Sequence, residues 1–261
     1  MKYNVIYNKS CLEGMKELPN ECIDLIFTDP PYYQHRAKNI KGLKNHKDVI
    51  TEFEFDEFES EEVFLKFMDE ILLELYRICK PGASGYMFCG DDFVSYLNKM
   101  VVKAGFQFRK VIHWHKTNPF PAIHTRKMFA NSMELAVHFS KGSPKTWNQK
   151  SVNEMHNFIE TPICMGNERS EHKTQKPLKV CIPFIEISSN VDEVVIDPFM
   201  GSGTTAIACL KTDRKFIGYE MSEKYCEIIQ KRYDEFMNQN SLFYNNPTPT
   251  IEKKNKIIKD V

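Results

Sequence analysis

The sequence lacks several features that would assign it to a common class of protein. Its eight cysteines form no CxxC pair, so we expect neither a zinc site nor a disulfide framework. No apolar run approaches the ~20 residues that span a bilayer, and the first residues contain no apolar segment of the kind found in signal peptides. Most cysteines lie in apolar runs, as reduced core thiols do in a cytoplasmic protein; they are Cys11, Cys22, Cys79, Cys89, Cys164, Cys181, Cys209 and Cys226.

The sequence also has no excess of charge of either sign, with 35 Lys and Arg against 35 Asp and Glu. The charges are nevertheless unevenly placed. Residues 35–47 hold five Lys or Arg and no acid, residues 48–62 hold eight acids, and residues 93–133 hold seven Lys or Arg and no acid. A single charged run is usually a solvated face, but two basic blocks around one candidate site indicate a surface for a polyanion.

Hydrophobic periodicity predicts strands and helices that alternate along the chain. The expected strands are 22–28, 85–89, 106–116, 133–141, 193–197 and 215–220. The expected helices are 61–80, 91–105, one after Pro177, about 203–211 and 222–238. This order predicts an α/β fold with a doubly wound, mostly parallel sheet and helices on both faces. Residues 142–170 show little periodicity, which indicates an irregular insertion, and the polar, Lys-rich tail is expected to be flexible.

The first unusual motif is "TDPPYY", residues 28–33, directly after an apolar run. Proline fixes φ and removes a backbone donor, and the residue before a proline is forced toward an extended conformation. Asp29-Pro30-Pro31 is therefore a stiff, extended step at the exit of a buried strand. Taken alone, it is equally consistent with a simple strand end.

The second motif is "DPFMGSGTT", residues 197–205, again at a strand exit. Gly201 and Gly203 allow a tight turn and a close approach of backbone to ligand. The segment has neither the GxxxxGK[ST] pattern of a phosphate loop nor the GxGxxG pattern of dinucleotide sites. Glu220 ends the next expected strand 23 residues after Asp197, where an acid can bind ribose hydroxyls. The implied ligand has an adenosine and no pyrophosphate.

Together these motifs resemble those of the beta class of DNA amino-methyltransferases that use S-adenosylmethionine. "DPPY" (29–32) looks like the catalytic motif, and Phe199, Gly201 and Gly203 match the Phe-x-Gly-x-Gly of the cofactor loop. "HKTQKP" (172–177) is similar to the element that this class carries beside the methionine pocket. "KTNPFP", which begins at Lys116, and "ME" at 133–134 also resemble the class, and the likeness covers roughly residues 4–237.

The resemblance implies roles for individual residues. The catalytic residues would be Asp29, Pro30 and Tyr32. The residues binding S-adenosylmethionine would be Asp197, Phe199, Gly201, Gly203, Thr204, Glu220, Ser10, His172, Thr174 and Lys176. Ser10 stands where the class usually carries an Asp that helps to hold the adenine. Basic residues near the site are expected to contact DNA; they are Arg36, Lys38, His124, Arg126 and Lys127.

The implied organisation is one methyltransferase domain in two halves. Residues 1–116 would form the catalytic half and 171–240 the cofactor-binding half, with 117–170 as an inserted target-recognition segment and 241–261 as a flexible polar tail. The implied partner is double-stranded DNA, with a homodimer and a restriction endonuclease as candidate partners. His113 and His115 share one strand face, but no metal site is expected there.

The expected chemistry explains the odd first motif. An exocyclic amino group lies inside the duplex, so the base must be flipped out at a cost of a few kcal/mol. Tyr32 would stack on the extruded ring. The Asp29 carboxylate and the Pro30 carbonyl would accept the two N–H bonds and favour a tetrahedral nitrogen.

Four readings stay open at this point. Asp at the first position of the catalytic motif favours methylation of adenine N6, whereas enzymes that methylate cytosine N4 more often carry Ser there. Related motifs also serve methylation of RNA or of a protein glutamine, although the basic blocks and the motif order disfavour a protein substrate. A catalytically silent DNA-binding protein is supported only by Ser10.

Overall fold

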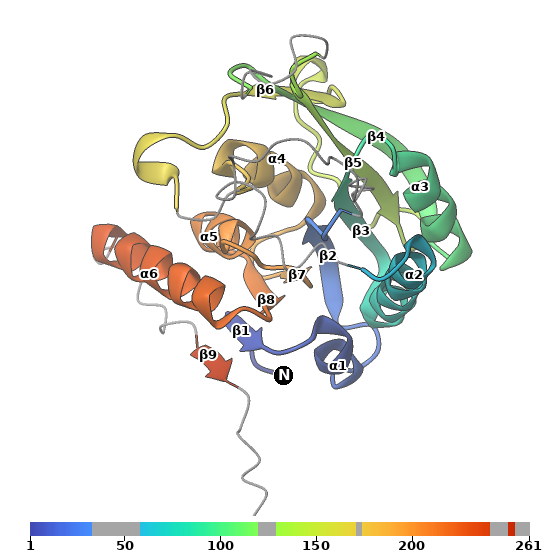
Figure 1. Ribbon diagram of the computed structural model, residues 1–261, viewed down its shortest axis with the longest axis horizontal. Helices are drawn as coiled ribbons and strands as arrows, with labels where there is room; N and C mark the ends of the chain where they lie inside the picture. Colours follow the sequence, from blue (N-terminus) through green and yellow to red (C-terminus); the bar gives the residue numbers. More distant parts are fainter. Residues whose placement is uncertain (33–57, 120–128, 171–173, 241–249, 254–261) are drawn as a thin grey trace, which may run out of the picture.

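The computed structural model describes residues 1–32, 58–119, 129–170, 174–240 and 250–253. Within these residues the chain forms a nine-stranded sheet in the order β6-β4-β5-β3-β2-β7-β8-β1-β9 (Figure 1). The strands are β1 (Val5–Asn8), β2 (Ile23–Thr28), β3 (Cys79–Cys89), β4 (Gln107–Lys116), β5 (Met133–Ser140), β6 (Phe158–Thr161), β7 (Val194–Asp197), β8 (Lys215–Tyr219) and β9 (Thr250–Lys253). Every strand pair is parallel except the two that involve β5. The α/β fold with a mostly parallel sheet is thus confirmed.

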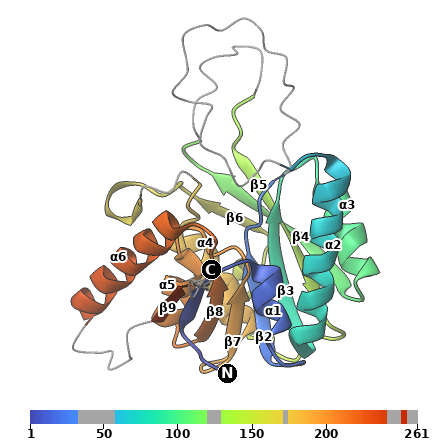
Figure 2. The ribbon, with the colours of Figure 1, turned by 60° about the horizontal axis from the view of Figure 1, so that its bottom comes forward.

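Helices cover both faces of the sheet. They are α1 (Cys11–Lys16), α2 (Glu61–Ile78), α3 (Val94–Lys103), α4 (Leu178–Ser188), α5 (Thr204–Lys211) and α6 (Glu223–Asn240), with short 3-10 turns η1 (Val152–Glu154) and η2 (Gly166–Glu168). Helices α1, α2 and α3 bury their apolar side chains on one face, and α4, α5 and α6 bury theirs on the other. Figure 2 shows the sheet standing between these two groups of helices. None of the helices that the structure describes is long and apolar enough to cross a membrane.

Helix α2 shows why the local sequence folds as expected. Phe64, Met68, Ile71 and Leu75 recur at a spacing of three or four residues and are all buried. The hydroxyl of Ser60 accepts a hydrogen bond from the Val63 backbone N–H at 3.3 Å and so caps the helix start. The apolar stripe therefore fixes the face that α2 presents to the sheet.

The sheet topology brings the two sequence motifs together. Strand β2 lies between β3 and β7, parallel to both, with Leu25 opposite Val195 and Ile26 opposite Ile196. Parallel neighbours end at the same edge of the sheet, and this edge is where such folds bind ligands. The exits of β2, β7, β8 and β1 therefore form one continuous row.

The structure corrects the expected start of the strand predicted at residues 85–89. Strand β3 begins at Cys79, not at Gly85, and runs through Pro81 and Gly82. The pairing of β3 with β2 shifts register between Ile23, which lies opposite Cys79, and Leu25, which lies opposite Ser84. Pro81 and Gly82 therefore lie in an irregularity of the strand, where the missing N–H of proline is tolerated. Helix α2 correspondingly ends at Ile78, before residue 80.

Sequence reasoning missed four short elements. β1 and α1 were not predicted, although they carry Ser10 between them. β6 lies in the segment expected to be irregular and pairs with β4. β9 lies in the tail expected to be flexible and pairs with β1, which corrects that expectation for Thr250–Lys253.

Candidate active site

The first motif follows the end of β2, and two side chains hold the carboxylate of its Asp29. The Tyr32 hydroxyl donates to Asp29 Oδ1 at 2.7 Å, and the Lys176 ammonium donates to Asp29 Oδ2. Burial raises the pKa of Asp29; the Lys176 ammonium opposes that rise, and the Glu134 carboxylate adds to it. Burial, and then the Asp29 charge, raises the pKa of Tyr32 well above its ordinary value, so its hydroxyl stays a donor. The motif thus presents a fixed acceptor at the sheet edge.

Lys176 was predicted beside the cofactor, and the structure brings its ammonium to the catalytic motif. Its Nζ lies 3.0 Å from Glu134 Oε2 as well as against Asp29. The ammonium also lies 5.0 Å from the ring centre of Phe88 and 5.9 Å from that of Tyr32. Burial alone would lower the pKa of Lys176, but the two carboxylates raise it above its ordinary value. Lys176 is therefore a permanent cation at this position.

Asp197 joins the two motifs. Its Oδ1 accepts hydrogen bonds from the Thr28 hydroxyl at 2.7 Å and from the Phe199 backbone N–H at 3.1 Å. Its Oδ2 accepts from the Thr205 hydroxyl at 2.6 Å. Burial raises the pKa of Asp197 to about 6, against these hydrogen bonds. Asp197 therefore fastens the end of β2 to the start and end of the cofactor loop.

The cofactor loop depends on two left-handed glycines, Gly201 at φ 53° and Gly203 at φ 78°. A β-carbon on Gly203 would lie 2.8 Å from Cγ2 of Ile229, so only glycine fits there. Arg232 on α6 donates to the Ser202 carbonyl and to the Thr204 hydroxyl. Sequence reasoning missed Arg232, because a single cation on an amphipathic helix gives no signal.

Phe199 lies on the other side of the loop. Its half-buried ring is 6.1 Å from the ring of Phe67 on α2, in an edge contact. The loop is therefore packed against α2 through Phe199 and against α6 through Gly203.

Glu220 follows β8 and faces the same loop. Its Oε2 accepts the Gly201 backbone N–H and its Oε1 accepts the Ser222 backbone N–H, both at 2.8 Å. Burial raises the pKa of Glu220 to about 7, which these N–H groups oppose. Each carboxylate oxygen can accept a second hydrogen bond. The residues therefore fit an adenosine, because an oriented carboxylate with spare acceptor capacity suits ribose hydroxyls.

Ser10 lies at the start of α1, between β1 and that helix. Its carbonyl accepts the Gly14 backbone N–H at 3.0 Å, and its half-buried side chain makes no capping hydrogen bond. The neighbouring Asn8 donates to the carbonyls of Glu220 and Met221 at 3.0 and 3.1 Å. Asn8 thereby ties the end of β1 to the end of β8, and it was also missed from the sequence.

The remaining predicted residues are only partly described. Thr174 is exposed, in the turn before Lys176. His172 lies outside the described residues. So do all the predicted DNA contacts, namely Arg36, Lys38, His124, Arg126 and Lys127.

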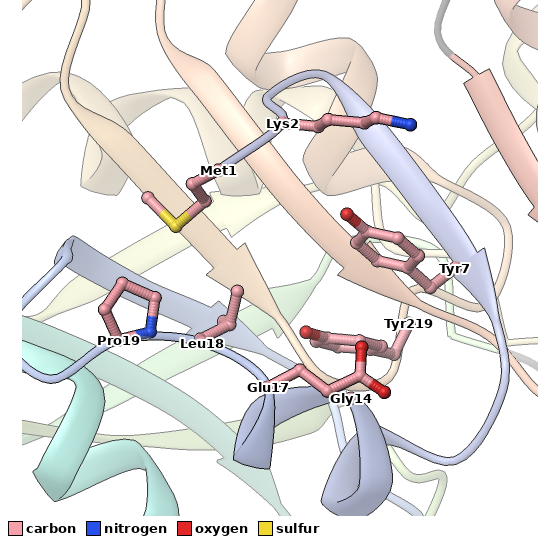
Figure 3. Close-up of a pocket in the computed structure, with 8 residues that line it drawn as sticks. All are labelled: Met1, Lys2, Tyr7, Gly14, Glu17, Leu18, Pro19 and Tyr219. Atoms are coloured by element: carbon pink, nitrogen blue, oxygen red, sulfur yellow. The ribbon is translucent and has the colours of Figure 1, made fainter.

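A cavity of about 230 Å³ lies between α1 and the strands β1 and β8, and it contains none of the predicted site residues. It is lined by Met1, Lys2, Tyr7, Gly14, Glu17, Leu18, Pro19 and Tyr219 (Figure 3). The rings of Tyr7 and Tyr219 stack at 5.6 Å along one side. Tyr219 directly precedes Glu220 and leaves no room for a β-carbon on Gly14, which would come within 2.0 Å of its ring.

Comparison with known proteins gives a consistent result. Residues 23–231 match the model of the N6_N4_Mtase family, described as DNA methylase. The type II methyltransferase M.HinfI of Haemophilus influenzae is 29% identical over 247 residues, which are 89% of this chain and 68% of that protein. The type II methyltransferase M.HpaI of Haemophilus parainfluenzae is 30% identical over 249 residues, 88% of this chain and 74% of that protein.

Solved structures give the same fold. A complex of M1.HpyAVI with SAM superposes with a TM-score of 0.65 at 28% identity, covering 87% of this chain and 98% of that one. The cytosine-N4-specific PvuII DNA methyltransferase superposes with a TM-score of 0.70 at 19% identity, covering 87% of this chain and 85% of that one. The second likeness concerns the fold alone.

Proposed function

The chain belongs to the DNA methylase family that its residues 23–231 match, and from that premise we propose that it methylates N6 of adenine within a short, specific sequence of double-stranded DNA. The methyl donor is S-adenosylmethionine. This reaction class matches the acceptor-rich exit of β2 beside a glycine loop suited to an adenosine.

One observation carries the proposal: Asp29 is an acceptor anchored by two donors at the carboxyl end of β2. Its carboxylate oxygens each retain a further lone pair. The carbonyl of Pro30 follows it directly, and proline fixes the direction of that carbonyl. Two acceptors side by side suit an amino group, which offers two N–H bonds.

The residues of the first motif would then act on the nitrogen lone pair. Acceptance of both N–H bonds by Asp29 and Pro30 localises a lone pair that is otherwise delocalised into the base. The nitrogen must lose one proton as it gains the methyl group, and the Asp29 carboxylate can accept that proton. The Tyr32 ring is steadied by its hydroxyl bond to Asp29 and would stack on the base.

S-adenosylmethionine supplies, when bound, an electrophilic methyl group on a sulfonium. Glu220 would bind the ribose hydroxyls, and the loop around Gly201 and Gly203 would carry the rest of the molecule. Ser10 would lie beside the adenine, with Phe199 closing the opposite side. Asp197 would act indirectly, because its oxygens hold Thr28, Phe199 and Thr205.

Adenine is preferred to cytosine on the identity of residue 29 alone. Both bases carry an exocyclic amino group on a six-membered ring, so the same two acceptors serve either. The likeness to the cytosine-specific PvuII enzyme is at 19% identity and bears on the fold alone. Cytosine N4 methylation therefore stays the alternative.

Recognition of the DNA sequence is proposed for residues 117–170 and for the basic residues near the site. Within this range, the described part of the chain adds β6 as an edge strand beside β4. Homodimerisation and a partner endonuclease for the same DNA sequence are further proposals that follow from the type II relatives.

The test is direct. Purified protein is incubated with S-adenosylmethionine and unmethylated DNA, and the nucleosides are analysed by mass spectrometry while the DNA is sequenced with a method that reports modified bases. N6-methyladenine in one short recurring context is the expected result. N4-methylcytosine would replace the base assignment, and an unmodified DNA pool with bound cofactor would overturn the DNA substrate.

A further inference from the structure

Lys116, Glu134 and Lys176 lie in segments that resemble motifs of the family, but the reaction above does not use them directly. Their charged groups form a row of ion pairs that ends at Asp29. Lys116 ends β4, Glu134 is the second residue of β5 and Lys176 precedes α4. Lys116 Nζ lies 2.9 Å from Glu134 Oε1, and Glu134 Oε2 lies 3.0 Å from Lys176 Nζ. Lys176 in turn contacts Asp29. The four side chains alternate in sign and sum to zero.

These charges are shielded from water. The side chain of Lys176 is 8% exposed, that of Lys116 12%, that of Glu134 21% and that of Asp29 27%. Charge pairs with so little solvent around them interact more strongly than pairs on the surface. A change of charge at Glu134 therefore affects Asp29, which contacts the same Lys176 ammonium.

We propose that Glu134 is a positioning residue that holds Lys176 away from exclusive pairing with Asp29, so that Asp29 can turn to the target amino group. Glu134 gives the ammonium a second carboxylate partner besides Asp29, and Lys116 balances Glu134 in turn. The rings of Phe88 and Tyr32 confine the ammonium between the two carboxylates. This inference rests on the proposed function of Asp29 as acceptor.

Glu134 and Lys176 act on Asp29 in opposite directions. Repulsion by Glu134 raises the pKa of Asp29, and attraction by Lys176 lowers it. Loss of the Glu134 charge should therefore lower the pKa of Asp29 and lock its carboxylate onto Lys176. Loss of the Lys176 charge should raise the pKa of Asp29 and free its carboxylate.

Other titratable groups face Asp29, and each is accounted for. Burial raises the pKa of Cys89, at the end of β3, to about 12, and raises that of Cys181 on α4 well above its ordinary value. Tyr32 also titrates far above neutrality. Asp197 has a pKa of about 6, but its partners are unchanged in the variants below, so its contribution to the pH profile is constant.

The experiment compares the acid limb, the fall of kcat/KM toward low pH, in two variants. Glu134→Gln should move the acid limb down by about 1 pH unit, lower the plateau kcat about tenfold, and leave the DNA Kd unchanged. Lys176→Met should move the acid limb up by about 1 pH unit. Glu134→Asp, which keeps the charge, should keep the acid limb of the unmodified protein.

A charge-balanced variant tests whether an effect of Glu134→Gln comes only from misfolding. Glu134→Gln leaves two neighbouring cations buried, so the double variant Lys116→Met/Glu134→Gln, which keeps the Lys176–Asp29 pair neutral, should show the same downward shift. Lys103→Met serves as the matched control, because its pair with Asp69 lies on the surface, and its acid limb should not move.

The outcomes separate this inference from the proposed function. Suppose that the unmodified protein methylates DNA, but that the acid limbs of Glu134→Gln and Lys176→Met move in the same direction or not at all. That result would overturn the positioning role of Glu134 and leave the proposed reaction unaffected. Failure of the unmodified protein to methylate any DNA base would overturn the proposed function itself.

Discussion

The proposed catalytic corner, around Asp29, and the proposed cofactor corner, around Asp197 and Glu220, hold their carboxylates in different ways. At the catalytic corner Asp29 is paired with a lysine, and that lysine is paired with a second carboxylate. At the cofactor corner Asp197 and Glu220 are held by hydroxyls and backbone N–H groups, and among the described residues no ion pair reaches either of them. In the first arrangement the Lys176 ammonium opposes the rise that burial causes in the pKa of Asp29. In the second, hydrogen bonds oppose burial, and the two acids have a pKa of about 6 and about 7.

The difference fits the two tasks that we propose for these corners. An acceptor that takes part in proton transfer benefits from a nearby cation that stabilises its ionised form. A ligand-orienting carboxylate needs fixed geometry more than a fixed charge, and backbone donors supply that geometry. The two corners therefore should respond differently to removal of charge and to pH.

The largest effect should come from Asp29→Asn. The amide keeps the size of the side chain but replaces one acceptor oxygen with a donor, so the amino group loses its proton acceptor. We expect kcat to fall at least about 10³-fold, with DNA binding largely intact in fluorescence anisotropy. Near-normal turnover in this variant would mean that Asp29 is not the acceptor.

Glu220 at the cofactor corner offers a comparison with Asp29 at the catalytic corner. Glu220→Gln should mainly weaken binding of S-adenosylmethionine in calorimetry and reduce kcat far less at saturating cofactor. Equal losses of kcat in Asp29→Asn and Glu220→Gln would erase the distinction between the two corners.

The cofactor loop should be the more sensitive corner to backbone change. Gly203→Ala places a β-carbon 2.8 Å from Ile229 at a φ of 78°, which should destabilise the fold by about 2–3 kcal/mol. Gly142 has a similar φ of 75° with open space around it, so Gly142→Ala should cost only about 1 kcal/mol. Thermal unfolding gives the loss of stability in each variant, and the difference between the two losses is the cost of the contact with Ile229. Equal losses would show that the Ile229 side chain moves away at little cost.

Cofactor binding should depend on pH through Glu220. Its pKa of about 7 means that the carboxylate gains its full acceptor capacity only as the pH rises through 7. We expect the affinity for S-adenosylmethionine to increase about tenfold from pH 6 to pH 8, measured by calorimetry. The Glu220→Gln variant should lack this dependence; its persistence there would assign the titration to another group.

The stability of the free protein should change in the opposite direction. The folded-state pKa of Glu220 lies above its ordinary value, so burial favours the protonated form. This contribution to the free energy of unfolding is complete below pH 4.5 and declines as the pH rises toward 7. Denaturant unfolding of Glu220→Gln, which cannot ionise, should show less of this decline.

The smallest effect is expected at an exposed ion pair. Lys103 and Asp69 lie 2.6 Å apart, but the Lys103 side chain is 71% exposed. Lys103→Met should change the free energy of unfolding by less than about 1 kcal/mol, as measured in urea. A larger loss would mean that short distance, without burial, is enough to make a pair strong in this protein.

The sequence was most informative where a strand ends in an unusual residue. Asp29, Asp197 and Glu220 each follow a buried apolar run, and parallel topology alone predicts that they share an edge. It was less informative about which group each polar side chain contacts. The motif that contains Lys176, for example, did not indicate that its ammonium lies between Asp29 and Glu134.

Other features left no periodic signal. β6 and β9 are four-residue edge strands, too short to display an alternation of apolar and polar residues. Pro81 and Gly82 signal a break, yet a register irregularity keeps them in β3. Asn8 and Arg232 act through hydrogen bonds to distant residues, which only the folded chain brings within reach.

The pairing of β9 with β1 has a practical consequence for handling the protein. β1 is flanked by β8 on one side and by β9 on the other, and Lys2 is joined to Glu252 across the outer pair. A chain shortened before residue 250 would expose the backbone donors and acceptors of β1, which a strand of a neighbouring molecule can bind. The four residues of β9 thus act as a guard against aggregation at the same strand that carries Asn8 to the cofactor corner.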